Sequence, residues 1–196
     1  MQNMPPMLAY TLRGSTASGI APLLIVGIGS QATRFTPANP QDDSYWFVFL
    51  DRNNPKNKVA DFLVPGQNNT AIPPNVDQYM SNPNCIFALA TQNLSMLHVP
   101  QGDFFNYLVK YGAGRELQRI EQLNSTLGCG SIGRPLYLLT GEGGPRGGTN
   151  PPLASYEKGS LANTEYILMS LMPLPNGQPP YSLCESYTWR AAAAHP

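Results

Sequence analysis

The side chains that could act in catalysis are few and far apart in this chain. The two histidines are His98 and His195, and the three cysteines are Cys85, Cys129 and Cys184. Cys129 stands in a Gly-Cys-Gly-Ser sequence that could present a nucleophile at a turn, but it would need His98 beside it as a base. No Gly-x-Ser-x-Gly nucleophile elbow occurs. We therefore favour a non-enzymatic protein with no catalytic residues, in which the two glycines end a helix and begin a tight turn.

No cofactor or metal site is predicted. The cysteines lack the Cys-x-x-Cys spacing of a zinc site, and their odd number leaves at least one free or paired between chains. Gly27 to Ala32 matches the Gly-x-Gly-x-x-Ala dinucleotide pattern, which needs a helix directly after it. Residues 33–43 instead contain two prolines and little helical periodicity. Gly141 to Gly148 is rich in glycine but lacks the Lys-Ser/Thr ending of a phosphate-binding loop.

Aromatic side chains offer a different chemistry, which is stacking on sugar rings. Trp46, Tyr187 and Trp189 are flat and largely apolar, and such surfaces suit the C–H faces of sugars. We predict these three as candidate carbohydrate-binding residues. Packing in the core or in a protein interface is the alternative for the same side chains.

The low and balanced charge of the chain excludes some classes of binding partner. The chain of 196 residues has 12 Lys and Arg against 12 Asp and Glu, and only 12% of its residues are charged, compared with about 25% in an average protein. Without a basic cluster, binding to nucleic acid or to a membrane surface is not expected. The longest apolar run, Ile20 to Ile28, is about half the length of a membrane-spanning helix. The expected partners are proteins, either other structural proteins or copies of the same chain, with a glycan as the alternative.

Apolar periodicity predicts an α+β chain. Strands are expected at 7–12, 22–28, 45–50, 58–64, 85–91, 135–140 and 165–171, and helices at 73–80, from Asp103 to 111 and over 115–127. Asp103 is expected to cap its helix. The continuous apolar run 22–28 is expected to be a strand buried on both faces.

Five segments of this series resemble one known family. They are the hairpin from Trp46–Asp51 to Phe62, the short helix Asn75–Met80, the buried strand Asn84–Thr91, the helix Glu116–Gly128 and the strand Arg134–Gly141. Together they resemble the interleukin-like EMT-inducer domain, also called the PANDER-like domain, which occurs in secreted cytokine-like proteins and in the stem of a mammalian O-mannose glycosyltransferase.

The resemblance implies a mixed β-sheet or sandwich-like core with one or two packed helices, and some relatives bind carbohydrate. That domain type is not itself catalytic, so no catalytic residue is carried over. Two departures stand against the likeness: the cysteines do not obviously occupy the family's disulfide positions, and the chain inserts residues 93–113 and continues past Pro145.

The resemblance divides the chain into three predicted parts. Residues 1–43 are predicted to form an N-terminal strand or strands and an arm, residues 44–145 the PANDER-like core, and residues 146–196 a C-terminal extension that packs on the core or on neighbouring subunits. The ends are expected to be long irregular arms.

The leading functional hypothesis is a structural subunit of a large assembly. Low charge and abundant proline and glycine are typical of chains that contact their neighbours through backbone and apolar groups, and this style is similar to that of tailed-phage virion proteins. We predict a head or tail protein of a virion, made in the host cytoplasm. The alternative is a carbohydrate-binding module used in host attachment.

Overall fold

The computed structural model describes residues 7–128, 133–144, 154–174 and 177–185, which form a mixed α+β fold. The strands are β1 Leu8–Ser15, β2 Leu23–Val26, β3 Thr33–Phe35, β4 Ser44–Asp51, β5 Asn54–Pro65, β6 Cys85–Gln92, β7 Leu136–Glu142, β8 Ser155–Ser160, β9 Thr164–Met172 and β10 Ser182–Glu185. The helices are α1 Asp77–Met80, α2 Gly102–Lys110 and α3 Arg115–Ser125, with 3-10 turns at Gly29–Gln31 and Met96–His98.

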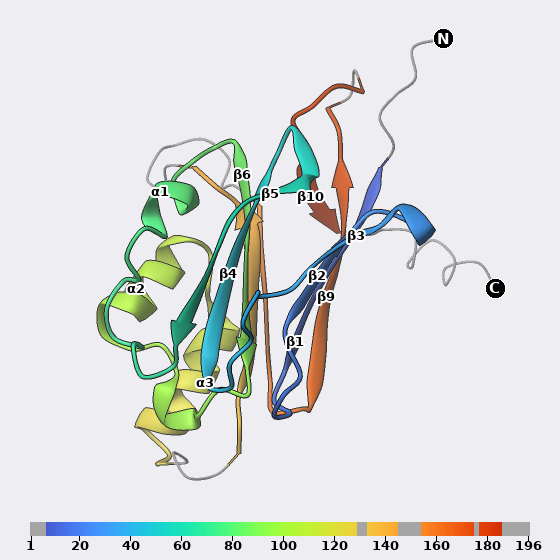
Figure 1. The fold of residues 1–196 in the computed structure, drawn as a ribbon. Helices are drawn as coiled ribbons and strands as arrows, with labels where there is room; N and C mark the ends of the chain where they lie inside the picture. Colours follow the sequence, from blue (N-terminus) through green and yellow to red (C-terminus); the bar gives the residue numbers. More distant parts are fainter. Residues whose placement is uncertain (1–6, 129–132, 145–153, 175–176, 186–196) are drawn as a thin grey trace, which may run out of the picture.

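The strands form two layers. One layer, here called the middle sheet, has the order β5-β4-β6-β7-β8, and the other, the outer sheet, has the order β10-β9-β1-β2-β3. One parallel pair, Ser15 with Gln92, joins them into a single hydrogen-bonded network. Figure 1 shows the three helices on one side of β4, β5 and β6, with β1, β2 and β9 on the other side. The order of layers is helices, middle sheet, outer sheet.

The middle sheet is covered on both faces, which explains its long apolar strands. Alternate residues of a strand point to opposite faces. Tyr45, Phe47 and Phe49 pack with the helices, whereas Trp46 and Val48 pack with the outer sheet. The sequence of a strand between two apolar layers is therefore an unbroken apolar run, as it is in β4.

The helices are held to the middle sheet by aromatic side chains. Phe104 of α2 lies edge-on to Tyr45, with ring centroids 5.3 Å apart, and Tyr79 of α1 stacks on Phe49 at 5.1 Å. Leu117 and Ile120 of α3 are buried in the same cluster. The polar sides of these helices face away from the sheet, as expected of amphipathic helices.

The outer sheet is built from the first three strands and the last two strands of the described chain. Each residue of β1 from Leu8 to Ser15 pairs with a residue of β9 from Thr164 to Leu171. The parts of the chain on either side of residues 44–145 therefore supply all five strands of the outer sheet. The predicted three-part division itself stays a prediction.

Several predicted elements are confirmed, with different bounds. The strands near 7–12, 45–50, 85–91, 135–140 and 165–171, the short helix and the helix over 115–127 all occur. The run 22–28 is a strand, but it is buried on one face only, because the outer sheet has no layer beyond it among the described residues. Asp103 is not the cap of α2: Gln101 holds that position without a side-chain bond, and Asp103 lies in the first turn.

Three short strands were not expected from the sequence. They are β3, β8 and β10, each of three to six residues. Their sequences lack a strong alternation of apolar and polar residues, and each pairs at an edge of its sheet. The expected irregular arms lie mainly outside the described residues.

Candidate functional site

Trp46, predicted to stack on a sugar, is a core residue. Its side chain is fully buried between the two sheets, and its indole Nε1 donates to Asp61 Oδ2 at 3.2 Å. A buried ring offers no face to a ligand, so the prediction for Trp46 is wrong. The other two candidates, Tyr187 and Trp189, lie outside the described residues.

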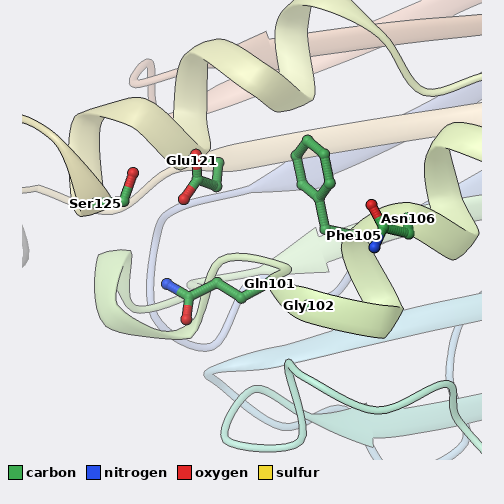
Figure 2. A pocket seen from close by; sticks show the side chains of 6 residues that line it. All are labelled: Gln101, Gly102, Phe105, Asn106, Glu121 and Ser125. Carbon is green, nitrogen blue, oxygen red and sulfur yellow. The ribbon is translucent and has the colours of Figure 1, made fainter.

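A hollow of about 420 Å³ lies between α2 and α3. Its lining residues are Gln101, Gly102, Phe105, Asn106, Glu121 and Ser125. Figure 2 shows the half-buried ring of Phe105 and the side chains of Gln101 and Glu121 around the gap between the helices. The hollow combines one aromatic ring with amide, carboxylate and hydroxyl groups.

A second hollow of about 400 Å³ shares Asn106 with the first. It is lined by Ile72, Asp77, Asp103, Asn106, Tyr107 and Lys110. The Asp77 carboxylate is fixed here, because Tyr107 Oη donates to its Oδ1 at 3.1 Å and Tyr111 Oη does so at 3.3 Å. Burial first, and then neighbouring Tyr111 and Asp77, raise the pKa of Tyr107, so the phenol stays protonated and remains a donor.

These two hollows could bind a ligand rich in hydroxyl groups. Amide and carboxylate groups bond to hydroxyls in pairs, and an aromatic ring packs against C–H groups. Sequence reasoning missed these residues because α2 and α3 are ordinary amphipathic helices in the sequence. Only their packing side by side creates the gap. The available signal was weak: two amide side chains, Gln101 and Asn106, at the start of α2 beside Phe105.

The outward side of the outer sheet is apolar. Leu168 is 54% exposed, Tyr166 44% and Met172 41%, and all three alternate with buried residues of β9. Leu23 and Ile25 of β2 are half-buried on the same side. We call these five residues, with Thr11, Arg13 and Arg34, the outer face. It is an apolar surface of neighbouring strands, unlike singly scattered exposed residues.

Strand register places the two arginines within this surface. Arg13 pairs with Leu23 on one side and with Tyr166 on the other, and Arg34 pairs with Ile25. Side chains paired in this way lie about 5 Å apart on one face. No Asp, Glu or Lys points outward from the described strands of this sheet, since Glu165 and Glu185 fall at the alternate positions.

Arg13 is incompletely bonded. Its Nη2 donates to Ala21 O at 2.8 Å, but its Nε is buried and has no hydrogen-bond partner among the described residues. A buried donor without an acceptor costs about 1–3 kcal/mol. Nε is enclosed by the fold, so any contact of Arg13 at this surface is made by its other nitrogens.

The imidazole of His98 is held by a carboxylate but not beside a nucleophile. His98 Nδ1 lies 2.6 Å from Asp43 Oδ2, and Ser95 N–H donates to Asp43 Oδ1 at 2.8 Å. Tyr45 donates to the His98 carbonyl. In the described part of the chain no serine, threonine or cysteine side chain bonds to this ring. The contacts of Asp43 with His98 and Ser95 therefore connect two loops at one end of the middle sheet.

The cysteines and the acidic residues form no evident reactive or metal-binding group. Cys85 is buried and Cys184 half-buried, both are free thiols, and burial raises the pKa of each. Cys129 lies outside the described residues. Within the ranges that the structure describes, no three His, Cys, Asp or Glu side chains are placed to hold a metal ion. Likewise, no described helix is both long and apolar enough to span a membrane.

No family model matches the chain, and no curated protein matches it significantly. The resemblance of residues 44–145 to the PANDER-like domain therefore stays a prediction.

Proposed function

We propose that this chain is a non-enzymatic structural subunit of a large protein assembly, a head or tail protein of a tailed-phage virion with a PANDER-like core. The observation that supports this proposal best is the outer face, where Tyr166, Leu168 and Met172 are exposed on one strand. Contiguous apolar surface on a folded chain is typical of a contact with another macromolecule.

The composition of the outer face also favours a protein contact. Interface centres are enriched in aromatic residues, methionine and arginine, and depleted of lysine and acids. Tyr166, Met172 and Arg13 fit this composition, and the described strands direct no lysine or acid outward here. The low overall charge of the chain is consistent with the same role.

Sedimentation of the chain from its producing cells tests this function. A tagged wild-type chain is expected to sediment with particles far larger than a monomer of 196 residues. Leu168→Asp is expected to move the chain to the slow fraction, because a buried unpaired carboxylate opposes the contact. Val109→Asp is the matched control, since Val109 is 40% exposed on α2. A wild-type chain found only as a monomer would refute the proposal.

The second candidate function is carbohydrate binding during host attachment. It is supported by the hollow between α2 and α3, where Phe105 lies among Gln101, Asn106 and Glu121. Sugar hydroxyls pair with amide and carboxylate groups, and a sugar ring packs on an aromatic face.

A glycan array measures this second function directly. If the hollow binds a sugar, Phe105→Ala should abolish the signal and Asn106→Ala should weaken it. Val109→Ala, also on α2 but outside the lining, should leave it unchanged. Absence of binding to any glycan by the wild-type chain argues against this function.

A further inference from the structure

We infer that the outer face docks a different protein, whose contacting surface is apolar and carries carboxylates opposite Arg13 and Arg34. This inference rests on the proposed function, because it names the kind of partner that the subunit contacts. It begins from the exposed residues of β9 and the half-buried residues of β2.

Charge complementarity selects the partner. The two charged side chains on the outer face are both arginines, paired in register with Tyr166, Leu23 and Ile25. A second copy applied through the same face would bring two more arginines and no acid, so the arginines would be covered without a carboxylate partner. A charge left buried and unpaired in an interface is costly. The face therefore favours an acidic partner over itself.

The bonding state of Arg13 is consistent with the same conclusion. In the described part of the chain Nη2 donates to Ala21 O at 2.8 Å and Nε is buried, whereas Nη1 makes no hydrogen bond and is not among the buried unsatisfied atoms. Nη1 can therefore donate to a carboxylate of the partner, and such charge-assisted bonds are strong.

The partner surface must also be apolar. Leu168 lies opposite Thr11, which lies opposite Ile25, so apolar side chains of β9 and β2 flank the outward residues of β1. A partner with a flat, apolar strand or helix surface can cover this row, whereas a soluble polyanion would leave it in water. A folded protein can present apolar side chains and carboxylates on the same surface, as this partner must.

Site-specific photo-crosslinking tests the inference in the assembled state. A benzophenone amino acid replaces Leu168, or Val109 as the control on the opposite layer, and crosslinked peptides are mapped by mass spectrometry. We expect Leu168 to crosslink to a different protein, at an apolar surface that contains Asp or Glu. Val109 should not give that product.

Charge reversal then separates a specific contact from mere proximity. Arg13→Glu and, independently, Arg34→Glu should each lower the yield of that product by about tenfold or more. Reversing the facing acid of the partner to Arg should restore it. Arg34 is exposed on a short edge strand, so Arg34→Glu remains informative if Arg13→Glu unfolds the chain.

Other outcomes overturn the inference. They are a crosslink to a second copy, a crosslink to residues 186–196 of the same chain, a partner surface without acids, or yields unchanged by both reversals. If the wild-type chain sediments with large particles but Leu168 gives one of these results, the inference fails while the proposed function stands. If the wild-type chain is only a monomer, the proposed function fails as well.

Discussion

At the scale of single residues, Arg52 illustrates how a charged side chain stabilises the fold. Its guanidinium donates from Nε to Tyr181 O at 2.9 Å, from Nη1 to Pro83 O at 3.1 Å and from Nη2 to Ser182 Oγ at 3.1 Å. Nη2 also lies 3.4 Å from Glu142 Oε2. One side chain therefore attaches β10 to the end of the middle sheet.

We predict that Arg52→Ala lowers the free energy of unfolding by about 3–5 kcal/mol, because it removes the three hydrogen bonds of the guanidinium together with its ion pair to the buried Glu142. Urea denaturation measures the change. Arg119→Ala is the control: the side chain of that arginine is 61% exposed and its ion pair within the described residues is with Glu116, so a loss of less than about 1 kcal/mol is expected. Similar losses in both variants would contradict the prediction.

Asp42 gives the stability of the chain a pH dependence. It accepts bonds from the Ser18 hydroxyl and from Gly19 N–H at 3.0 Å, and these bonds lower its pKa from the ordinary 3.8 to about 2. A carboxyl group with a lowered pKa stabilises the folded state above about pH 4, and this contribution is lost as the pH falls toward 2. The effect is modest because the group is close to solvent.

We therefore predict that Asp42→Asn lowers the thermal midpoint most at pH 5–7, and that the difference from wild type shrinks between about pH 4 and pH 2. Thermal unfolding followed by circular dichroism at each pH measures it. Asp103→Asn is the control, because no hydrogen bond to that carboxylate occurs in the described ranges. A difference that is constant with pH would refute this account of Asp42.

At the scale of elements, the start of α3 is capped by a residue from another strand. Glu157 of β8 accepts from Glu116 N at 2.9 Å and Leu117 N at 3.3 Å, and Tyr137 Oη donates to the same carboxylate at 2.9 Å. Gly114, at the capping position, has no side chain to do this. Burial first, and then Glu157, raise the pKa of Tyr137, so the phenol remains a donor.

We predict that Glu157→Ala lowers the free energy of unfolding by about 2–4 kcal/mol, from the lost cap and the unpaired phenol. Hydrogen exchange at residues 116–118 should speed up more than exchange in α2. Glu121→Ala, on the outer part of the same helix, is the control and should have little effect. Unchanged exchange at the start of α3 would show that Glu157 is not its cap.

Some strands could be predicted from their sequence patterns and others could not. The run Tyr45 to Leu50 predicts a strand by itself, since both faces of β4 are buried and every residue is apolar. The short edge strands β3, β8 and β10 were missed, because each has only three to six residues without a strong apolar-polar alternation and is recognised only by its pairing with the strand before it. Ser155–Ser160, for example, pairs with Leu136–Gly141.

At the scale of the whole molecule, the two faces of the outer sheet have different roles. Leu12 of β1 is fully buried against the middle sheet, whereas Leu168 of the adjacent strand is 54% exposed on the other side. A leucine is therefore a core residue at position 12 and a surface residue at position 168.

We predict that, in the purified chain, Leu12→Ala lowers the free energy of unfolding by about 2–5 kcal/mol and Leu168→Ala changes it by less than about 0.5 kcal/mol. Denaturant unfolding of both variants measures this. A large loss in Leu168→Ala would mean that the outer face is already covered in the purified chain, which would oppose both proposals.

The sequence by itself determined the α+β class, the main strands and helices and the scarcity of charge, because these depend on local periodicity and composition. It could not decide whether Trp46 is accessible: Trp46 has the residue type of a sugar-binding side chain, but β4 lies between two layers and the ring is buried. Nor could it reveal the hollow beside Phe105 or the row of apolar residues around Arg13. Those surfaces exist only where separate elements pack side by side, α2 with α3 and β1 with β9, and this packing is a property of the tertiary structure.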